Sequence, residues 1–383
     1  MDLPASLIAF CGHTAICVWL FNRLHAMPWP CRVIRLLERA ILLFAAVVLV
    51  IYAARWLVTG VCVYAGEPLT AVQGAWLIYS LASLAAAIAA VPLWAIPKAL
   101  ARTPAALQSN HTSRVDLVEK LGSRPVGTQL TAMLAAVPGN EIFTLAVQTK
   151  HVRLSGLPAA LAGLRVAHLS DLHMTGRFTR EFYEEIVEQT NALRPDVIAL
   201  TGDVCEKEKC LDWIVPVLGK LNAPQGKFFV LGNHETRLPD AAPLRRLLAD
   251  AGFIDLAGRW IEHTIAGTAV VLAGNELPWI GDAPNMAGAP AGRLRILLSH
   301  TPDQFFWAQR EGFQLMLAGH NHGGQIRLPL IGPLITPSRY GSRYASGLYH
   351  EGPTLLHVTR GIAGVHPVRF NCPPELALLV LEP

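Results

Sequence analysis

Three long apolar runs dominate the first quarter of this 383-residue chain. They cover Leu3–Phe21, Ile41–Leu57 and Ala75–Ile96, and each is close to the roughly 20 residues that an α-helix needs to cross a bilayer. The alternative is a set of buried core helices, which is disfavoured because the three runs lie together with almost no polar face. The sequence therefore predicts a transmembrane region of about three helices over residues 1–97.

Charge and cysteine usage limit the partners of the remaining chain. Residues 160–383 have an ordinary globular mixture, and the net charge of the whole chain is only +4. So small a charge, without a basic stripe interleaved with aromatic residues, gives no reason to expect a nucleic-acid partner. The seven cysteines form no Cys-x-x-Cys pattern, which argues against a disulfide framework or a thiolate metal site.

Basic residues next to the apolar runs predict an orientation. Four arginines lie between the first two runs, at positions 23, 32, 35 and 39, whereas no lysine or arginine lies between Thr59 and Gly74. Lys98 and Arg102 follow the third run. Because cytoplasmic loops carry the excess of basic residues, the first loop and everything after Pro97 are expected in the cytoplasm.

The pattern after the apolar region changes twice. Residues 98–156 are expected to form a connector, with strand-like residues at Ile142–Leu154 and a short helix around Val115–Leu121. From residue 157 onward a second domain begins, in which short apolar strands alternate with helices, as in an α/β sheet. The expected strands are Arg165–Ser170, Asp196–Thr201, Lys227–Leu231, Ala269–Ala273, Leu294–Leu298 and Leu315–Ala318.

Polar residues follow five of these strands. They are Asp171 and His173, then Asp203, then Asn233 and His234, then His300, and finally His320 and His322. Ligands gather just past the carboxyl ends of strands in such sheets. A lone His-x-His pair is weak evidence for a metal, but carboxylates, an amide and imidazoles at five strand ends are too regular for surface scatter.

These side chains suit divalent metals that prefer oxygen and nitrogen ligands. Two ions about 3.5–4 Å apart would share one carboxylate, and a shared water would become a hydroxide near neutral pH. Such a site is suited to phosphoester hydrolysis, because a charge-dense phosphoryl group must be held while the hydroxide attacks in line.

Residues 164–382 resemble the calcineurin-like metallophosphoesterases, because five sequence blocks of that family occur in order. The blocks are D-x-H at Asp171/His173, GD-x-x-[DE] at Asp203/Glu206, GNH-[DE] at Asn233/His234, a single histidine at His300, and GH-x-H at His320/His322. The stretches GGQIRLPL, PSRYGSRYASGLY and CPPELALLVL further resemble the membrane-anchored bacterial branch. The resemblance implies a metallophosphoesterase β-sandwich flanked by helices over residues 157–383, in a bacterial inner membrane protein.

The resemblance also implies a ligand set for two divalent ions, expected to be manganese, iron or zinc. One ion takes Asp171, His173, Asp203 and His322, and the other takes Asp203, Asn233, His300 and His320, so Asp203 bridges. His234 is the expected non-ligand histidine that binds phosphate and protonates the leaving oxygen, which makes His234 and Asp203 the expected catalytic residues. Glu206 and Glu235 stand where many relatives have aspartate.

The expected function is that of a membrane-anchored phosphodiesterase. Its substrate is expected to be a lipid-linked or nucleotide-sugar phosphoester, hydrolysed by a hydroxide that bridges the two metals. Some relatives in the wider superfamily hydrolyse UDP-diacylglucosamine, and others cleave aryl phosphodiesters or nucleic acid. Two alternatives stay open: an inactive membrane-bound binding or sensing protein, and a nuclease or nucleotide phosphodiesterase. The complete ligand set argues against the first, and the absence of a basic stripe argues against the second.

Overall fold

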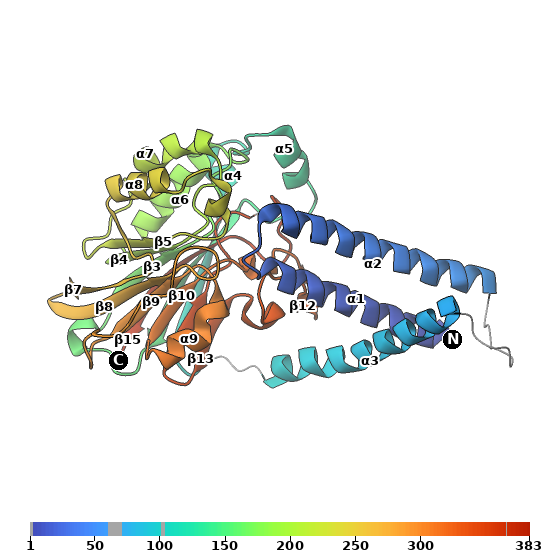
Figure 1. Ribbon diagram of the computed structural model, residues 1–383. Coiled ribbons are helices and arrows are strands. Elements are labelled where there is room, and N and C mark those ends of the chain that lie inside the picture. Colours follow the sequence, from blue (N-terminus) through green and yellow to red (C-terminus); the bar gives the residue numbers. More distant parts are fainter. Residues whose placement is uncertain (1–2, 60–70, 101–103, 365) are drawn as a thin grey trace. The chain divides into compact units, whose positions relative to one another are not determined.

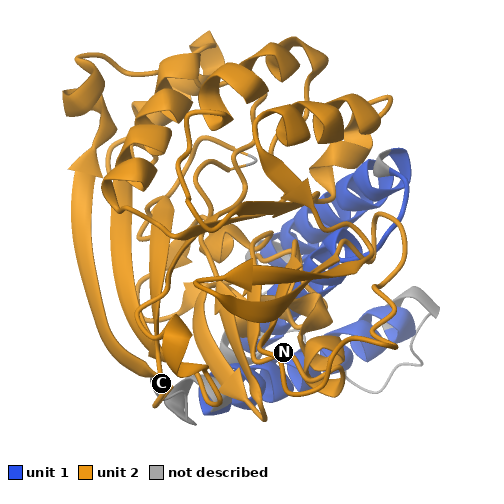
Figure 2. Ribbon diagram, turned by 90° about the vertical axis from the view of Figure 1, so that its left-hand side faces the viewer, with its two compact units in different colours: residues 1–102 blue, residues 103–383 orange. Residues whose placement is uncertain are grey.

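The computed structural model describes residues 3–59, 71–100, 104–364 and 366–383. The chain divides into two compact units, Met1–Arg102 and Thr103–Pro383, which are coloured separately in Figure 2. Each unit is described by itself below.

The first unit consists of three long helices, α1 (Leu3–His25), α2 (Cys31–Thr59) and α3 (Ala71–Leu100). Each contains a stretch that is long and apolar enough to cross a membrane, namely Leu7–His25, Arg32–Ala54 and Gly74–Ile96. The prediction of three apolar helices is therefore confirmed. Large apolar side chains also cover their outer surfaces, as expected where lipid replaces water.

The helix ends differ from the predicted spans. α2 begins at Cys31, ten residues before the predicted start, so Arg32, Arg35 and Arg39 lie within the helix instead of in a loop. Arginine and leucine are strong helix formers, so the helix extends beyond its apolar stretch. Most of the second loop, residues 60–70, lies outside the described residues.

A central polar contact joins the three helices of this unit. The Nδ1 of His13 in α1 lies 2.6 Å from the hydroxyl of Tyr79 in α3, and its Nε2 lies 3.3 Å from the carbonyl of Ala45 in α2. The preceding residue, Gly12, approaches the backbone of Ser83 so closely that a Cβ would lie 1.7 Å from the carbonyl oxygen. Small residues and interhelical hydrogen bonds of this kind hold membrane helices together.

The second unit is built on two large sheets (Figure 1). The seven-stranded sheet has the order β1-β2-β15-β3-β4-β5-β6, and the six-stranded sheet has the order β13-β14-β10-β9-β8-β7. The strands of the first sheet are β1 (Leu107–Asp116), β2 (Thr144–Arg153), β15 (Glu375–Glu382), β3 (Arg165–Leu169), β4 (Val197–Thr201), β5 (Lys227–Val230) and β6 (Phe253–Asp255). Those of the second are β13 (Gly347–Glu351), β14 (Thr354–Val358), β10 (Leu315–Ala318), β9 (Arg295–Ser299), β8 (Thr268–Asn275) and β7 (Trp260–Ile265).

Three apolar layers hold the sheets and helices together. The layer between the sheets contains side chains from both, such as Val166, Phe228 and Leu317. Helices α6 (Arg180–Ala192), α7 (Ile214–Leu218) and α8 (Ala242–Asp250) cover the outer face of the seven-stranded sheet, and α9 (Phe305–Arg310) packs on the other sheet (Figure 1). The predicted α/β sandwich flanked by helices is confirmed.

Parallel pairing places the ends of the central strands at common edges. β3, β4 and β5 are parallel neighbours in one sheet, and β8, β9 and β10 are parallel neighbours in the other. The loops that follow these strands are therefore brought to one end of the sandwich, as expected for ligand sites in such sheets.

The segment expected to be a connector, residues 98–156, contributes two strands to the second unit. The strand predicted at Ile142–Leu154 and the short helix predicted around Val115–Leu121 are present as β2 and α4 (Leu117–Leu121). The strands β1 and β2 belong to the seven-stranded sheet, and the compact unit includes residues from Thr103 onward. β1 is an edge strand whose side chains are mostly exposed, so it lacks the apolar alternation that marks a strand in sequence. β2 pairs in parallel with β15, which comes from the far end of the chain.

Candidate metal centre

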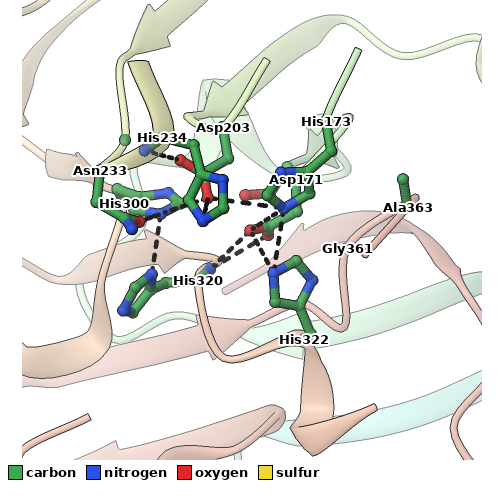
Figure 3. A network of polar contacts seen from close by, with 12 residues as sticks. Asp171, His173, Asp203, Asn233, His234, His300, His320, His322, Gly361 and Ala363 are labelled. Carbon is green, nitrogen blue, oxygen red and sulfur yellow. Dashed lines mark hydrogen bonds and ion pairs between the residues drawn. The ribbon is translucent and has the colours of Figure 1, made fainter. Parts of the chain in front are cut away.

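The loops after five strands bring all seven predicted ligands into one cluster, in which every ligand except the half-buried Asn233 is buried (Figure 3). Asp171 and His173 follow β3, Asp203 follows β4, Asn233 follows β5, His300 follows β9, and His320 and His322 follow β10. Two groups have ligand atoms within 4.8 Å of one another: Asp171, His173, Asp203 and His322 form one, and Asp203, His300 and His320 form the other. Asp203 is common to both groups.

Five of these residues adopt a backbone conformation that ordinary residues avoid. Their φ angles are 57° at Asp171, 45° at His173, 51° at Asp203, 70° at His320 and 48° at His322. A left-handed conformation costs roughly 1–2 kcal/mol for a residue with a Cβ. Such strain accumulates where a functional arrangement is imposed on the chain by the surrounding structure.

One glycine shows how closely the strand-end loops approach one another. A Cβ at Gly319 would lie 1.9 Å from the Oγ of Ser170 and 2.5 Å from the Oδ2 of Asp171. A side chain at position 319 would therefore displace Asp171, whose carboxylate accepts a hydrogen bond from the backbone N–H of His320 at 3.2 Å.

We expect Gly319→Ala to lower metal affinity without removing a ligand, because the added methyl group would push Asp171 out of position. Isothermal titration of the metal-free protein with Mn²⁺ would measure this loss. Gly74→Ala in α3 is the control, because no atom lies within 4 Å of the added Cβ and Gly74, like Gly319, does not have the positive φ that would strain an alanine. Equal metal affinity in both variants would contradict the close packing around Asp171.

On one side of Asp203, hydrogen-bond acceptors face one another. The Nδ1–H of His300 donates to the carbonyl of Thr201 at 2.8 Å, so Nε2 carries the lone pair of the neutral ring. This Nε2 lies 3.0 Å from the Oδ1 of Asn233 and 3.3 Å from the Oδ2 of Asp203. Burial lowers the pKa of His300, but the Asp203 carboxylate outweighs it and raises the pKa to about 9. Without a metal, the carboxylate therefore favours a proton on Nε2, and a cation bound between these three atoms would take the place of that proton.

On the other side, two imidazole nitrogens face each other. The Nε2 of His173 lies 3.2 Å from the Nε2 of His322 and 3.7 Å from the Oδ2 of Asp203. The Nε2 of His322 also lies 3.5 Å from the Oδ1 of Asp171. Both carboxylates and both rings are buried, so bulk water does not offset the crowding of acceptor atoms.

Several buried ligand atoms have no hydrogen-bond partner within the described part of the chain. They are the Oδ2 of Asp203, the Nε2 of His320 and the Nδ1 of His322. Unsatisfied buried polar atoms are costly, and a coordinated cation would satisfy them. Carboxylate, amide and imidazole ligands suit Mn²⁺, Fe²⁺ or Zn²⁺. The residues present therefore fit divalent cations on both sides of Asp203.

Glu206 connects two histidines of the site. Its Oε1 lies 2.6 Å from the Nδ1 of His173 and 2.9 Å from the Nδ1 of His234. Its Oε2 accepts a hydrogen bond from Arg237 at 2.5 Å. Burial alone would raise the pKa of Glu206, but the hydrogen bonds from the two rings hold it well below its ordinary value. Glutamate at this position therefore orients both imidazoles.

His234 lies beside the ligand cluster. Its backbone N–H donates to the Oδ1 of Asp203 at 2.9 Å, and its Nε2 lies 3.9 Å from the Oδ2 of that carboxylate. His173, Glu206 and His234 are also close enough to form a metal group by themselves. However, both rings direct Nδ1 to the same Glu206 oxygen, which is the arrangement of a carboxylate that orients histidines.

Glu235 fixes the two loops that carry Asp203 and Asn233. Its carboxylate accepts hydrogen bonds from the backbone N–H groups of Gly232 at 2.6 Å and Val204 at 2.6 Å, and from two further N–H groups at 3.1 Å. Burial and the Asp203 charge raise the pKa of Glu235 to about 7 against these hydrogen bonds.

Trp279 covers the His320 side of the cluster. Its ring centroid lies 4.7 Å from that of His320 and 5.8 Å from that of His300. On the opposite side, the fully buried Arg369 donates to the carbonyls of Arg360 at 2.8 Å and His322 at 3.4 Å. Arg369 lies outside every motif block, so sequence reasoning had no signal for its role in holding the His322 turn.

Glu206→Gln should weaken metal binding by about 10–100-fold, which is the usual effect of removing the partner of a ligating histidine. The amide cannot accept hydrogen bonds from both rings as strongly as the carboxylate does. Arg237→Met is the matched control, because it removes only the cation beside Glu206 and leaves both histidine contacts in place. Equal Mn²⁺ affinities in the two variants would show that Glu206 does not position His173.

Comparisons with known proteins point to one enzyme family. A profile described as calcineurin-like phosphoesterase matches residues 164–324. The chain is 33% identical over 245 residues to the uncharacterized metallophosphoesterase YkuE of Bacillus subtilis, covering 61% of this chain and 85% of that protein. It is 28% identical over 235 residues to the phosphodiesterase YaeI of Escherichia coli, covering 60% and 86%. It is 27% identical over 313 residues to the UDP-2,3-diacylglucosamine pyrophosphatase LpxG of Chlamydia muridarum, covering 65% and 95%.

Proposed function

Because the chain belongs to the calcineurin-like phosphoesterase family, we propose that it is a membrane-anchored phosphodiesterase with two divalent metals and a lipid-linked substrate. The observation that carries the proposal is the buried cluster of two carboxylates and four histidines, with Asp203 shared between its two halves and Asn233 at its edge. The three helices that can span a membrane supply the anchor.

The proposed ligand set divides at Asp203. One ion is assigned to Asp171, His173, Asp203 and His322, and the other to Asp203, Asn233, His300 and His320. When bound, two such ions offset the charge of the phosphoryl group and lower the pKa of a shared water, so that a nucleophile forms at neutral pH.

His234 is assigned the proton transfer to the leaving oxygen. Glu206 lies 2.9 Å from the Nδ1 of this ring and favours its protonated form, although burial outweighs the carboxylates and lowers the pKa of His234. Its Nε2 is directed to the cluster, 3.9 Å from Asp203. A ring whose two nitrogens have these different partners can donate from Nε2 while remaining oriented through Nδ1.

Turnover of bis(4-nitrophenyl) phosphate by the full chain with added Mn²⁺ tests the proposed activity directly. Metal-dependent release of nitrophenol that disappears with a chelator is the expected result. The rival reading is an inactive binding or sensing protein, which would show no turnover with any of Mn²⁺, Fe²⁺ or Zn²⁺. Faster cleavage of single-stranded DNA than of every lipid or nucleotide-sugar diester would instead support a nuclease.

The lipid-linked substrate is supported by two independent features. A relative bears the name UDP-2,3-diacylglucosamine pyrophosphatase, and that substrate carries acyl chains. The chain itself has three helices that can span a membrane, and a lipid substrate is already concentrated there. Rates on matched diesters with short and long acyl chains would test this. Equal kcat/KM for both would remove the lipid substrate from the proposal.

The catalytic unit is proposed to face the cytoplasm of a bacterial inner membrane, because the arginines cluster around the α1–α2 turn. Single cysteines at Ala65 and Asn110, in a background without the native cysteines, test this orientation. A membrane-impermeant thiol reagent applied to intact cells should label position 65 only. If position 110, an exposed site in β1, is labelled and position 65 is not, the orientation is the reverse of the proposed one.

A further inference from the structure

The segment that follows the metal ligands exposes a series of large apolar side chains. The exposed fractions are 46% for Ile326, 41% for Leu328, 93% for Leu330, 40% for Ile331 and 50% for Ile335. They lie on or beside the small hairpin of β11 (Arg327–Leu328) and β12 (Gly332–Pro333). A water-soluble surface seldom carries so many contiguous apolar side chains without a binding role.

A second apolar group borders the same part of the surface. Helix α5 (Gln129–Ala135) and the turn after it expose Leu130, Met133 and Val137. Phe370 links the two groups, because its backbone pairs with Ile326 and its ring lies 3.5 Å from the Cβ position of Gly139. We call these eight apolar residues of the hairpin and the α5 region the apolar rim.

The tip of the hairpin has a left-handed backbone conformation. Leu330 has a φ of 63° and follows Pro329 in the turn. Glycine or asparagine adopts this conformation with little strain, whereas the Cβ of leucine makes it unfavourable. Leu330 is also the most exposed large apolar side chain of the hairpin, so it would be the first to meet a surface that packs against the tip.

The hairpin is fixed to the turn that carries His322. The Nε of Arg327 donates to the carbonyl of Gly323 at 2.9 Å. Gly324 approaches Pro333 so closely that a Cβ would lie 2.4 Å from the proline Cβ. A surface that contacts the hairpin would therefore lie next to the metal centre.

Two features of the chain indicate that the apolar rim contacts a lipid bilayer. Only six residues separate the end of α3 at Leu100 from the start of β1 at Leu107, which limits the separation of these two points to about 25 Å. Residues 325–349 contain no aspartate or glutamate, so the segment brings no acidic side chain to an anionic lipid surface. We propose that the apolar rim inserts into the headgroup region of the membrane, with Leu330 at its deepest point.

Insertion would present the metal centre to phosphoesters in the plane of the membrane surface, a consequence that rests on the proposed function. The acyl chains of such a substrate would stay in the bilayer while the phosphoryl group reaches the cluster. The docking itself requires no turnover, so it is tested separately from the activity.

Photo-cross-linking of the full chain in nanodiscs of phosphatidylethanolamine and phosphatidylglycerol tests the docking. Benzoylphenylalanine is placed at Leu330 and, in a separate variant, at Leu328. Thr264, an exposed position on β7 in the six-stranded sheet, is the negative control. Leu81, an exposed position in the apolar helix α3, is the positive control. Lipid adducts at both hairpin positions, with yields close to that at Leu81, are the expected result. Yields no higher than at Thr264 would overturn the proposal. Adducts to protein alone, as expected if the hairpins of two copies of the chain pack together, would also overturn it.

Leu330→Asn separates docking from folding. Asparagine tolerates the left-handed conformation, so the thermal midpoint should stay the same or rise. Adducts at Leu328 should fall about tenfold in this variant, because the deepest apolar anchor is lost. Hydrolysis of bis(4-nitrophenyl) phosphate, which needs no membrane, should change less than twofold. Unchanged adducts at Leu328 would contradict the role of Leu330 as an anchor.

Discussion

Asp203→Ala is expected to abolish phosphodiester hydrolysis more completely than any other single substitution in the metal centre. Asp203 is common to both groups of ligand atoms, so its removal takes a ligand from each proposed ion. Its Oδ1 also accepts the backbone N–H of His234 at 2.9 Å, which positions that ring. The loss should therefore exceed the roughly 10²–10⁴-fold that a general acid contributes.

Metal content and rate measured on the same preparation would check this prediction. Asp203→Ala should retain less than one ion per chain, whereas Asp212→Ala, the same change at an exposed aspartate, should match the unsubstituted protein in both respects. An Asp203→Ala protein that keeps its full metal content and a measurable share of its rate would show that this carboxylate does not bridge.

His234→Ala is expected to keep its metals and lose about 10²–10⁴-fold in rate. The ring contacts Glu206 through Nδ1 and lies 3.9 Å from Asp203, so it lies beside the ligand cluster without a place in either proposed ligand set. The loss should be largest for diesters with poor leaving groups, because these need a proton most. Rates on a series of aryl and alkyl diesters would measure the dependence.

His322→Ala provides the comparison for His234→Ala. His322 belongs to a proposed ligand group, so its replacement should lower both the metal content and the rate. If His234→Ala released as much metal as His322→Ala, then His234 would be a ligand, and the group formed by His173, Glu206 and His234 would be the relevant one.

The sequence was most informative where a strand ends in a loop of polar residues. The short apolar strands β3, β4, β5, β9 and β10 each stand out between turn residues, and the side chains after them meet in one cluster. Parallel pairing makes this convergence predictable, because neighbouring parallel strands end at the same edge. The three helices that are long and apolar enough to span a membrane were also predictable from length and apolarity.

Other features depend on contacts between distant parts of the chain. The polar edge strand β1 has no apolar alternation, and β15 joins the sheet between β2 and β3, although some 200 residues separate it from either. The contact of Glu206 with two histidines, and the buried position of Arg369, arise only when separate loops meet. Helix ends differed because charged helix formers extend a membrane helix beyond its apolar stretch.

We propose that two ions act together at the shared carboxylate of Asp203. Titration of the metal-free full chain with Mn²⁺, with rate and bound metal followed in the same samples, tests it most directly. Bound metal is expected to rise to about two ions per chain, and most of the rate should return only as the second ion binds. Full activity with one ion per chain or fewer would contradict the two-metal assignment.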